Sequence, residues 1–470
     1  MRIAWTLAAA FALGGCVFPQ VEDPATAPVA TESLGLDGDS IAPADARWWT
    51  ALGDPQLDAL IEEALRGSPT LAQTLARVRS AQAQSDAAGS ERQPRFTFDA
   101  DETYQRFSEH FYIPPPYGGN NYWVGQATAN MSWDLDFWGR QSALISQANA
   151  QLAASQLDVA AARLALAGAI TQTYLDLHRA WEMIDIATRL EIQRQHLLDL
   201  TRQRVSAGLD TQMEIKIAEA TLPQARNARL QAEGERDVAL HRLAELTGHG
   251  ADRYAQISRP KLTLDAGLSL PDHLPADLLA HRPDVLAART RVDAATAGRE
   301  AAHAEFYPNV NLKAFVGTQA IGLDKLVDGG SLIYGAGPAL HLPIFDARRL
   351  RANYKGATAD LDASIAGYNE TVLAAIRETS DQISLGDYFT QQIDQAQQTL
   401  DAAGAAYDLA QKRYEAGLST QLVVLDAESR VLDARRDLVI LNSNRLLSRV
   451  NLLLMLGGSF DPAAPASGDI

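Results

Sequence analysis

Charged side chains recur around two similar stretches of the sequence, Arg204–Gln212 and Arg413–Gln421. Each stretch has an arginine, a glycine four residues later, and a polar pair that follows a leucine. An arginine near the carboxyl end of a helix is favoured by the helix dipole, and Asp, Ser or Thr after such a glycine can cap the next helix. The chemistry that these residue types offer is therefore ion pairing and helix capping at two turns.

Motifs for enzyme catalysis are absent from the sequence. The nine histidines are scattered without the HExxH spacing of zinc enzymes, and no Gly-x-Ser-x-Gly nucleophile elbow occurs. Gly335-Ala336-Gly337 lies in an alternating stretch rather than at a strand-to-helix turn, so it does not indicate a dinucleotide site. The net charge of −17 argues against nucleic acid, because phosphate binding needs a basic surface. We expect no enzyme activity, no metal and no cofactor other than a covalent lipid.

Cys16 is the one cysteine among 470 residues, and it follows a signal-peptide pattern. A positive residue and an apolar run precede Leu13-Gly14-Gly15-Cys16, which has the form of a bacterial lipobox. We predict a signal peptide over 1–15 and a lipidated Cys16 that opens a tether over 16–46. Val17, rather than an aspartate, follows the cysteine. By resemblance to lipoprotein sorting signals, this favours retention in the outer membrane over the inner membrane. The alternative is an ordinary secretory signal with an incidental cysteine.

The two charged stretches lie between long helical patterns. Four helices are predicted, over about 140–207, 211–247, 346–416 and 420–456. Gly208 and Gly417 each end a helix, because glycine enters the left-handed region at little cost. At about 1.5 Å per residue, roughly 70 residues reach on the order of 100 Å, more than a compact soluble domain needs. Helices of this length must pack laterally against others.

The two glycines lie nearly half the chain length apart, so the chain is predicted to repeat one plan. The predicted division is a first repeat over 47–248, a linker or equatorial segment over 249–281, a second repeat over 282–457 and a flexible tail over 458–470. Pro223 is expected to kink the helix that contains it.

Period-two alternation predicts two β-hairpins, at about 94–136 and 308–344. Each has one apolar and one polar face, which is the pattern of a membrane β-barrel. Pro338 should weaken the last strand, because proline has no N–H to donate. No interior stretch reaches the roughly 18 apolar residues of a membrane helix.

Four strands cannot close a barrel alone, and open sheet edges are not tolerated in lipid. We therefore predict a symmetric ring of chains, in which three copies would supply twelve strands. The predicted fold class is an α+β membrane protein. The physical interpretation is a hollow cylinder with a two-fold internal repeat, in which a β-barrel in the outer membrane continues into a long periplasmic α-helical barrel; the trimeric, 12-stranded form of the barrel is what the family resemblance given below implies.

Several motifs carry a resemblance to one family. They are Trp48-Trp49, Leu52-Gly53-Asp54-Pro55-Gln56-Leu57, Arg282-Pro283-Asp284-Val285, Phe306-Tyr307-Pro308, Leu342-Pro343-Ile344-Phe345-Asp346 and Arg413-Tyr414-x-x-Gly417. In this combination the sequence resembles the TolC-like outer-membrane efflux factors, in particular the NodT-like efflux lipoproteins, from about 47 to 457. The resemblance implies a homotrimer that docks to a periplasmic adaptor and an inner-membrane RND-type pump. It also implies export of drugs or other small molecules.

The resemblance assigns a pore constriction to Leu422 and Asp426. These residues match the positions that form a leucine ring and an aspartate ring in relatives, and their i, i+4 spacing puts them on one helix face. Three carboxylates at a narrow pore would attract cations, and a leucine ring would dewet it. The alternatives are ordinary helix packing for Leu422 and a solvated or capping charge for Asp426.

The resemblance also implies that the tips hold a closed state. Glu214 matches an acid that pairs with the neighbouring hairpin in relatives, and Arg413 and Tyr414 are the expected partners. Some relatives carry an arginine where this chain has Ser419, which puts one such contact in doubt. Arg413 can instead be a cation favoured by the helix dipole. Gly208 is expected to serve both as a turn and in adaptor docking, and the same holds for Gly417.

Five aromatic residues are predicted to form an interfacial belt, with plain barrel packing as the alternative. They are Tyr104, Tyr122, Trp123, Trp133 and Trp138. The Trp48-Trp49 pair should pack the tether against the helices. The rival functions are a structural periplasmic coiled-coil lipoprotein without channel activity and an envelope hydrolase or metal-binding lipoprotein.

Overall fold

The computed structural model describes residues 23–30, 34–36, 45, 47–110, 112–263, 273–275, 277–343, 346–458 and 460. The signal peptide, Cys16 and most of the predicted tether and tail lie outside the described residues. The chain forms two compact units, and each takes segments from both halves of the sequence. The first unit includes 77–155 and 287–369, and the second includes 156–286 and 370–470. These units divide the chain differently from the predicted repeats, which remain a prediction.

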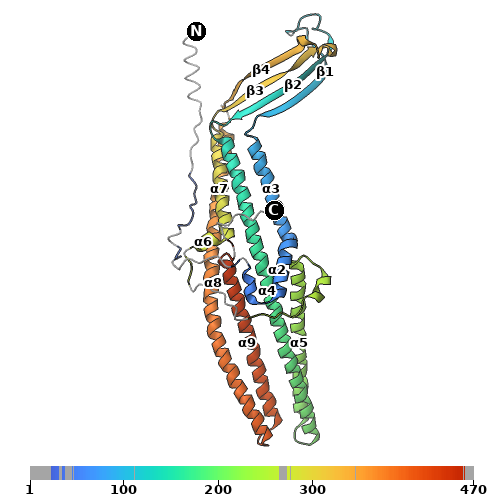
Figure 1. Ribbon diagram of the computed structural model, residues 1–470, viewed down its shortest axis with the longest axis vertical. Helices are drawn as coiled ribbons and strands as arrows, with labels where there is room; N and C mark the ends of the chain where they lie inside the picture. Colours follow the sequence, from blue (N-terminus) through green and yellow to red (C-terminus); the bar gives the residue numbers. More distant parts are fainter. Residues whose placement is uncertain are drawn as a thin grey trace. The chain divides into compact units, whose positions relative to one another are not determined.

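The first unit contains a four-stranded antiparallel sheet in the order β1-β2-β3-β4 (Figure 1). Its strands are β1 (Arg95–Arg106), β2 (Asn121–Leu135), β3 (Asn309–Ile321) and β4 (Leu332–His341). The short helices η4 (Leu323–Lys325) and η5 (Gly329–Ser331) lie between β3 and β4. The four strands that alternation predicts are therefore present, although β4 ends before the predicted boundary.

Strand register gathers the large apolar side chains on one face of the sheet. Tyr104 pairs with Trp123, and Leu135 pairs with Val310, which pairs with Leu340. Directly paired residues point to the same side of a sheet. The apolar face carries Phe96, Phe98, Tyr104, Trp123, Met131, Trp133, Leu135, Val310, Leu312, Val316, Leu332, Tyr334 and Leu340. The exceptions on the apolar face are Glu102, Arg106, Asn121 and Thr318, and the large apolar residues on the polar face are Tyr122, Val124, Phe315, Ile321 and Ile333.

The two outer strands leave open edges. In the part of the chain that the structure describes, β1 pairs only with β2, and β4 pairs only with β3. Every residue of β1 is exposed. Pro338 was expected to weaken β4, yet the strand continues through it, since an edge strand can leave a missing N–H outside the ladder.

The remaining helices of the first unit flank the sheet in sequence. They come from parts of α3 (Pro69–Ser90), α4 (Arg140–Ser206), α7 (Pro283–Ala304) and α8 (Ala347–Glu415). Part of the predicted tether contacts α8, because Thr26 N donates to Asp362 Oδ1 at 2.9 Å and Asn369 Nδ2 donates to Ala27 O at 2.9 Å. This short segment is therefore bound along the helix.

The second unit contains two helical hairpins. α4 is followed by α5 (Gln212–Leu246), and α8 is followed by α9 (Gln421–Met455). The shorter elements are η2 (Trp48–Leu52), α2 (Pro55–Gly67), η3 (Ala251–Gln256) and α6 (Leu278–His281). α5 runs through Pro223 as one helix.

The hydropathy of α4 differs from the sequence expectation. Among the described residues, it alone has an 18-residue window apolar enough to cross a membrane by length and composition. The window tolerates polar residues, which a continuous apolar run does not. A single such helix is weak evidence for a membrane span, since a long helix of a soluble protein passes the same test.

Buried side chains of η2, α2, α4, α5 and α9 form the core of the second unit. Trp48 and Trp49 are 3% and 5% exposed and belong to this core. Asp54 caps α2, because its side chain accepts from Gln56 N. Fully buried Tyr174 donates to Asp54 Oδ2 at 2.6 Å, so the cap also fastens α2 to α4. Partnering of this kind offsets the cost of burying polar groups.

Candidate functional site

The first tip, residues 204–214, turns the chain from α4 into α5. Leu209 N donates to Arg204 O at 2.9 Å and Gly208 N donates to Val205 O at 3.0 Å. This pair of bonds is a Schellman motif, which places its glycine in the left-handed region. Gly208 accordingly has φ +74°. The backbone turn is therefore the one that the sequence predicts.

Side-chain hydrogen bonds also stabilise the first tip, in addition to the backbone bonds. Arg204 Nε and Nη2 donate to the two carboxylate oxygens of Asp210 at 2.6 and 3.1 Å. Thr211 and Glu214 form a capping box at the start of α5, with Thr211 N donating to Glu214 Oε2 at 3.0 Å. The bond from Arg204 lowers the pKa of Asp210, and the bond from the Thr211 side chain lowers the pKa of Glu214. Both acids are therefore used within their own hairpin.

The second tip, residues 413–423, has the same backbone turn. Leu418 N donates to Arg413 O at 2.8 Å, Gly417 N donates to Tyr414 O at 2.9 Å, and Gly417 has φ +71°. Its side chains do not repeat the first tip. Thr420 stands at the N-cap of α9 without a side-chain cap bond, and the shielded Ser419 Oγ has no hydrogen-bond partner among the described residues.

The three residues predicted to hold the closed state have different surroundings in the structure. Glu214 belongs to the capping box, whereas Tyr414 OH reaches Gln421 Oε1 of its own hairpin at 3.5 Å. Arg413 is exposed, and within the described residues its side chain has neither a hydrogen bond nor an ion pair. The single chain does not bring these groups together, and their pairing across hairpins stays a prediction.

Leu422 and Asp426 lie on an exposed face of α9. Leu422 is 46% exposed, and the side chain of Asp426 is 69% exposed. Asp426 Oδ2 lies 3.2 Å from Nε of Arg430, one turn further along the same face. Sequence reasoning missed this partner, although the i, i+4 spacing of an acid and an arginine is a signal for it.

The other face of α9 packs against α4. Leu425 and Ser429 are buried, and Arg194 Nη2 donates to Ser429 Oγ at 2.8 Å. Gln193 Nε2 also donates to Leu425 O. These contacts fix the rotation of α9, and no contact among the described residues buries the face that carries Leu422 and Asp426.

Sequence reasoning also missed a set of ion pairs that joins α4 to α5 in the first hairpin. Glu191 of α4 accepts from Nε of Arg226 and Nε of Arg229, both at 2.9 Å. The hydrogen bond from Arg229 and then that from Arg226 lower the pKa of Glu191. A glutamate opposite two arginines three residues apart is visible in the sequence only after the hairpin register is known.

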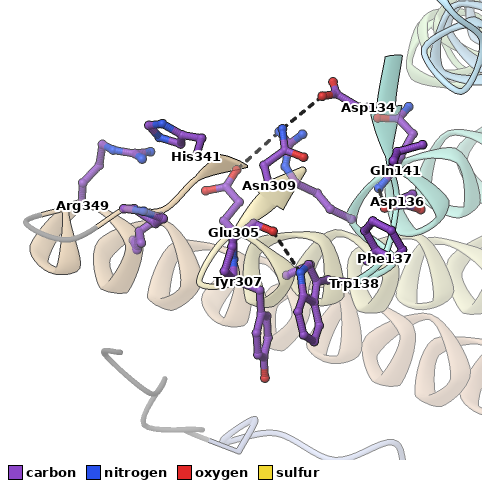
Figure 2. A pocket seen from close by; sticks show the side chains of 16 residues that line it. Asp134, Asp136, Phe137, Trp138, Gln141, Glu305, Tyr307, Asn309, His341 and Arg349 are labelled. Atoms are coloured by element: carbon purple, nitrogen blue, oxygen red, sulfur yellow. Dashed lines mark hydrogen bonds and ion pairs between the residues drawn. The ribbon is translucent and has the colours of Figure 1, made fainter. Parts of the chain in front are cut away.

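A cavity of about 290 Å³ lies in the first unit, where the strands meet the helices (Figure 2). We call it the junction cavity. Its lining comes from 134–141, from 304–309, and from His341, Pro343, Arg349 and Leu350. Sequence reasoning did not predict it, because its walls come from segments far apart in the chain.

Four of the five aromatic side chains of the predicted belt are exposed in this unit, whereas Tyr122 is half-buried and lies on the polar face of the sheet. Trp138 stacks on Tyr307, with ring centroids 4.7 Å apart, and its Nε1 donates to Pro308 O at 2.9 Å. Trp133 Nε1 donates to Arg92 O at 3.0 Å. Tyr104 and Trp123 form a second aromatic pair at 5.2 Å. The indole N–H groups of Trp133 and Trp138 are hydrogen-bonded at one end of the sheet, while their rings stay exposed.

Titratable groups do not gather into a metal site. Among the described residues, no group of three or more His, Cys, Asp or Glu side chains could hold a metal ion. The chemistry that the described tips offer is ion pairing, helix capping and contact between exposed side chains.

Comparison with known proteins finds similar sequences and similar structures. Fusaric acid resistance protein FusA of Burkholderia cepacia is 36% identical over 75% of this chain and 68% of its own length. Outer membrane protein OprJ of Pseudomonas aeruginosa is 31% identical over 96% of this chain and 95% of its own. The crystal structure of the outer membrane protein VceC of Vibrio cholerae covers 89% of this chain and all of VceC, with 34% identity and a TM-score of 0.82.

The family described as outer membrane efflux protein matches residues 60–249 and 274–458. This match takes in both helical tips and all four strands. Together with the full-length similarity to OprJ and the fold of VceC, it confirms the predicted resemblance: the chain belongs to the outer membrane efflux protein family.

Proposed function

We propose that the protein is the passive exit duct of a tripartite efflux system, assembled as a homotrimer in the outer membrane. The register of the sheet carries the proposal. It gathers most of the large apolar side chains of all four strands on one face and most of the polar side chains of β1, β2 and β3 on the other, as a wall between lipid and water requires. The proposed barrel has twelve strands, four from each chain.

The open edges of β1 and β4 support the trimer. Their backbone groups lack strand partners within the described chain, and lipid offers no substitute. A ring of copies pairs each β1 with the β4 of a neighbour and leaves no edge. The long helices then continue as an α-helical barrel in the periplasm, and the two halves of each chain act as structural repeats.

We further propose that the second tip regulates the passage. Leu422 and Asp426 would face the axis as a constriction, since the opposite face of α9 is already buried against α4. Arg413 and Tyr414 would contact a neighbouring hairpin, with Glu214 as their acidic counterpart. Opening would be a two-state rearrangement of the hairpins, biased by a periplasmic adaptor that meets Gly208 and Gly417.

The cargo and the anchor follow from different features. FusA carries fusaric acid resistance in its name, and the related MdtP of Escherichia coli is called a multidrug resistance outer membrane protein. We propose small organic molecules as cargo, driven by an inner-membrane RND-type pump. Cys16 would carry the lipid that anchors the tether to the outer membrane.

Planar-bilayer conductance of the purified protein, with its mass measured by native mass spectrometry, tests the duct. We expect a trimer with small conductance that rises in the Asp426→Ala variant. A monomer, or a trimer that never conducts even after Asp426→Ala and disruption of the tips, would favour the coiled-coil scaffold instead. Cys16→Ser should abolish labelling by radioactive fatty acid, and unchanged labelling would reject the anchor.

A further inference from the structure

The two edge strands, β1 and β4, carry different side chains on the polar face of the sheet (Figure 1). On that face β1 has the acids Asp99 and Asp101, whereas β4 has the small residues Gly335, Gly337 and Ala339. In the proposed ring, the β1 of one chain lies beside the β4 of the next. The acids of one chain therefore lie beside a strand of the other that has little side chain on this face, a placement that rests on the proposed function.

Lys313 is the residue of β3 that pairs with Gly337 on the polar face. Its side chain is exposed and has neither a hydrogen bond nor an ion pair among the described residues. Asp134 is its diagonal neighbour on β2, but this acid accepts from Asn311 Nδ2 at 2.5 Å and from Asn309 Nδ2 at 3.1 Å, the latter bond being drawn in Figure 2. The ammonium group of Lys313 is therefore left without a counter-ion in the described part of its own chain.

Gly337 leaves room for this lysine to cross β4. No atom lies within 4 Å of a Cβ built at Gly337, whereas a Cβ built at Gly335 would lie 2.7 Å from the ring of Phe315. The space over Gly337 is thus open, and the space over Gly335 is filled. The neighbour's β1 would lie two strand spacings from β3, roughly 10 Å, so the four-carbon stem of a lysine and an aspartate side chain can meet over the glycine.

The two aspartates of β1 differ in what they already bind. Asp99 Oδ2 accepts from Thr97 Oγ1 at 3.1 Å and from Asn130 Nδ2 at 2.8 Å. Asp101 is exposed, and its carboxylate has neither a hydrogen bond nor an ion pair within the residues that the structure describes. Asp101 is therefore the acid that remains for a cation of the neighbouring chain.

The alternation of side chains does not by itself decide how the edges of two chains align. A slip by one residue would turn the apolar side chains of β1 to the polar face, whereas a slip by two residues keeps both faces. In an antiparallel pair, placing Asp101 opposite Gly337 also places Gln105 opposite Ile333, and a slip by two residues would place Thr103 there. An ion pair at one position can select among the registers that alternation allows, because complementary charges act chiefly on specificity.

We propose that Lys313 of each chain binds Asp101 of the neighbouring chain across Gly337, which gives three equivalent ion pairs on the water-facing wall of the barrel. The pair selects the register in which β4 joins the neighbour's β1. Because both side chains are exposed, the pair contributes more to register than to stability.

Disulfide cross-linking of the full-length protein in its membrane measures the register. Ile333→Cys is combined with Gln105→Cys, with Thr103→Cys or with Tyr104→Cys, and cross-linked oligomers are quantified on non-reducing gels. We expect about fivefold more cross-linking with Gln105→Cys than with Thr103→Cys, since a disulfide needs closely opposed Cβ atoms. Tyr104→Cys is the control for the faces, because its side chain lies on the apolar face and should cross-link least.

Lys313→Gln should remove the preference for Gln105→Cys, because only faces and edges then remain to align the chains. Equal cross-linking through Gln105→Cys and Thr103→Cys with Lys313 in place would overturn the proposal. A preference that is unchanged in Lys313→Gln would also overturn it.

Exchanging the charges tests the pair itself. Lys313→Glu and Asp101→Lys should each accelerate dissociation of the purified trimer in detergent by roughly threefold to tenfold at low salt, and less at high salt. The combined variant restores opposite charges and should dissociate at nearly the original rate. Lys325→Glu is the matched control, because Lys325 is an exposed lysine of η4, between β3 and β4. Combined with Asp101→Lys, it should restore nothing.

A combined Lys313→Glu and Asp101→Lys variant that dissociates as fast as the single variants would reject the ion pair. So would equal restoration by Lys325→Glu. Planar-bilayer conductance of the unsubstituted protein separates this failure from that of the duct. A conducting trimer without restoration rejects the ion pair alone, whereas a chain that stays monomeric and never conducts rejects the duct.

Discussion

The two helical tips have the same backbone turn and different side-chain contacts. In both, a glycine with positive φ ends the helix, and the following leucine donates to the arginine four residues before that glycine. The first tip adds the Arg204–Asp210 ion pair and the Thr211–Glu214 capping box. The second tip has Ser419 and Val423 at the positions of Asp210 and Glu214, so neither contact can form.

This difference separates what a tip needs to turn from what holds it in one conformation. The glycine and the backbone bonds are sufficient for the turn, because they are present in both tips. The side chains of the first tip restrain its own hairpin, whereas those of the second leave Arg413 exposed and Leu418 70% exposed. We therefore expect the second tip to be the more mobile one in an isolated chain and the more dependent on neighbours.

Alanine at either glycine should give the largest effect and the same effect at both tips. No atom lies within 4 Å of a Cβ built at Gly208 or at Gly417, so the cost is backbone strain alone. A left-handed non-glycine residue costs about 1 to 2 kcal/mol. Hydrogen–deuterium exchange of peptides over each tip measures the free energy of local opening. Unequal losses would show that the two turns are not equivalent.

Removing the N-cap hydroxyl should distinguish the tips. Thr211→Ala removes the cap bond to Met213 N, whereas Thr420 has no such bond to lose. The expected loss of local stability is about 1 kcal/mol at the first tip and little at the second, since cap removal is typically of that size. The same exchange experiment measures both, and a similar loss in Thr420→Ala would mean that the second tip is capped in solution.

Exchanging the acid between the tips should have a smaller effect. Asp210→Ser breaks the ion pair with Arg204 and should raise the rate of hydrogen–deuterium exchange at the first tip towards the rate at the second tip. Ser419→Asp places a carboxylate where Arg413 can reach it and should lower exchange at the second tip. The pair is half-buried and still reached by solvent, so both changes should weaken in high salt. Exchange that is insensitive to both substitutions would show that the ion pair does not restrain the tip.

The helices and strands were predicted from the local periodicity of the sequence, whereas the side-chain contacts within the tips were not. Helical patterns over about 140–207 and 346–416 correspond to α4 (Arg140–Ser206) and α8 (Ala347–Glu415), because periodicity and a stop glycine are both local signals. The four strands followed from alternation for the same reason. The resemblance assigned Glu214 to a pairing across hairpins, which stays a prediction, and the capping box that the Thr-x-x-Glu spacing also indicates was not predicted.

Contacts between distant segments could not be predicted in this way. The junction cavity joins the end of β2 to the start of β3 and to α8, and only the paired register brings those segments together. The exposed face of α9 likewise depends on contacts between distant segments, because it is the face opposite the one that packs against α4. Resemblance placed Leu422 and Asp426 without their contacts, so Arg430 was overlooked.

Acidification should loosen the first tip alone. Hydrogen bonds lower the pKa of Asp210 and Glu214 below their ordinary values of 3.8 and 4.5. An acid with a depressed pKa in the folded state adds stability above its unfolded pKa and loses that contribution as pH falls through the folded value. A spin label at Leu209→Cys should therefore gain mobility as pH is lowered below about 4, whereas one at Leu418→Cys should not.

The two label positions are matched, because Leu209 is 65% exposed and Leu418 is 70% exposed. Both acids are half-buried at the surface and still reached by solvent, so the effect should be the smallest of the four and should decrease with salt. Adding Asp210→Asn and Glu214→Gln to the labelled protein should remove the pH dependence while leaving the turn intact, since Gly208 and its backbone bonds are unchanged. Equal loosening at both labels would instead locate the titrating groups outside the tips, and the contrast between the two hairpins would then lie in their packing rather than in these side chains.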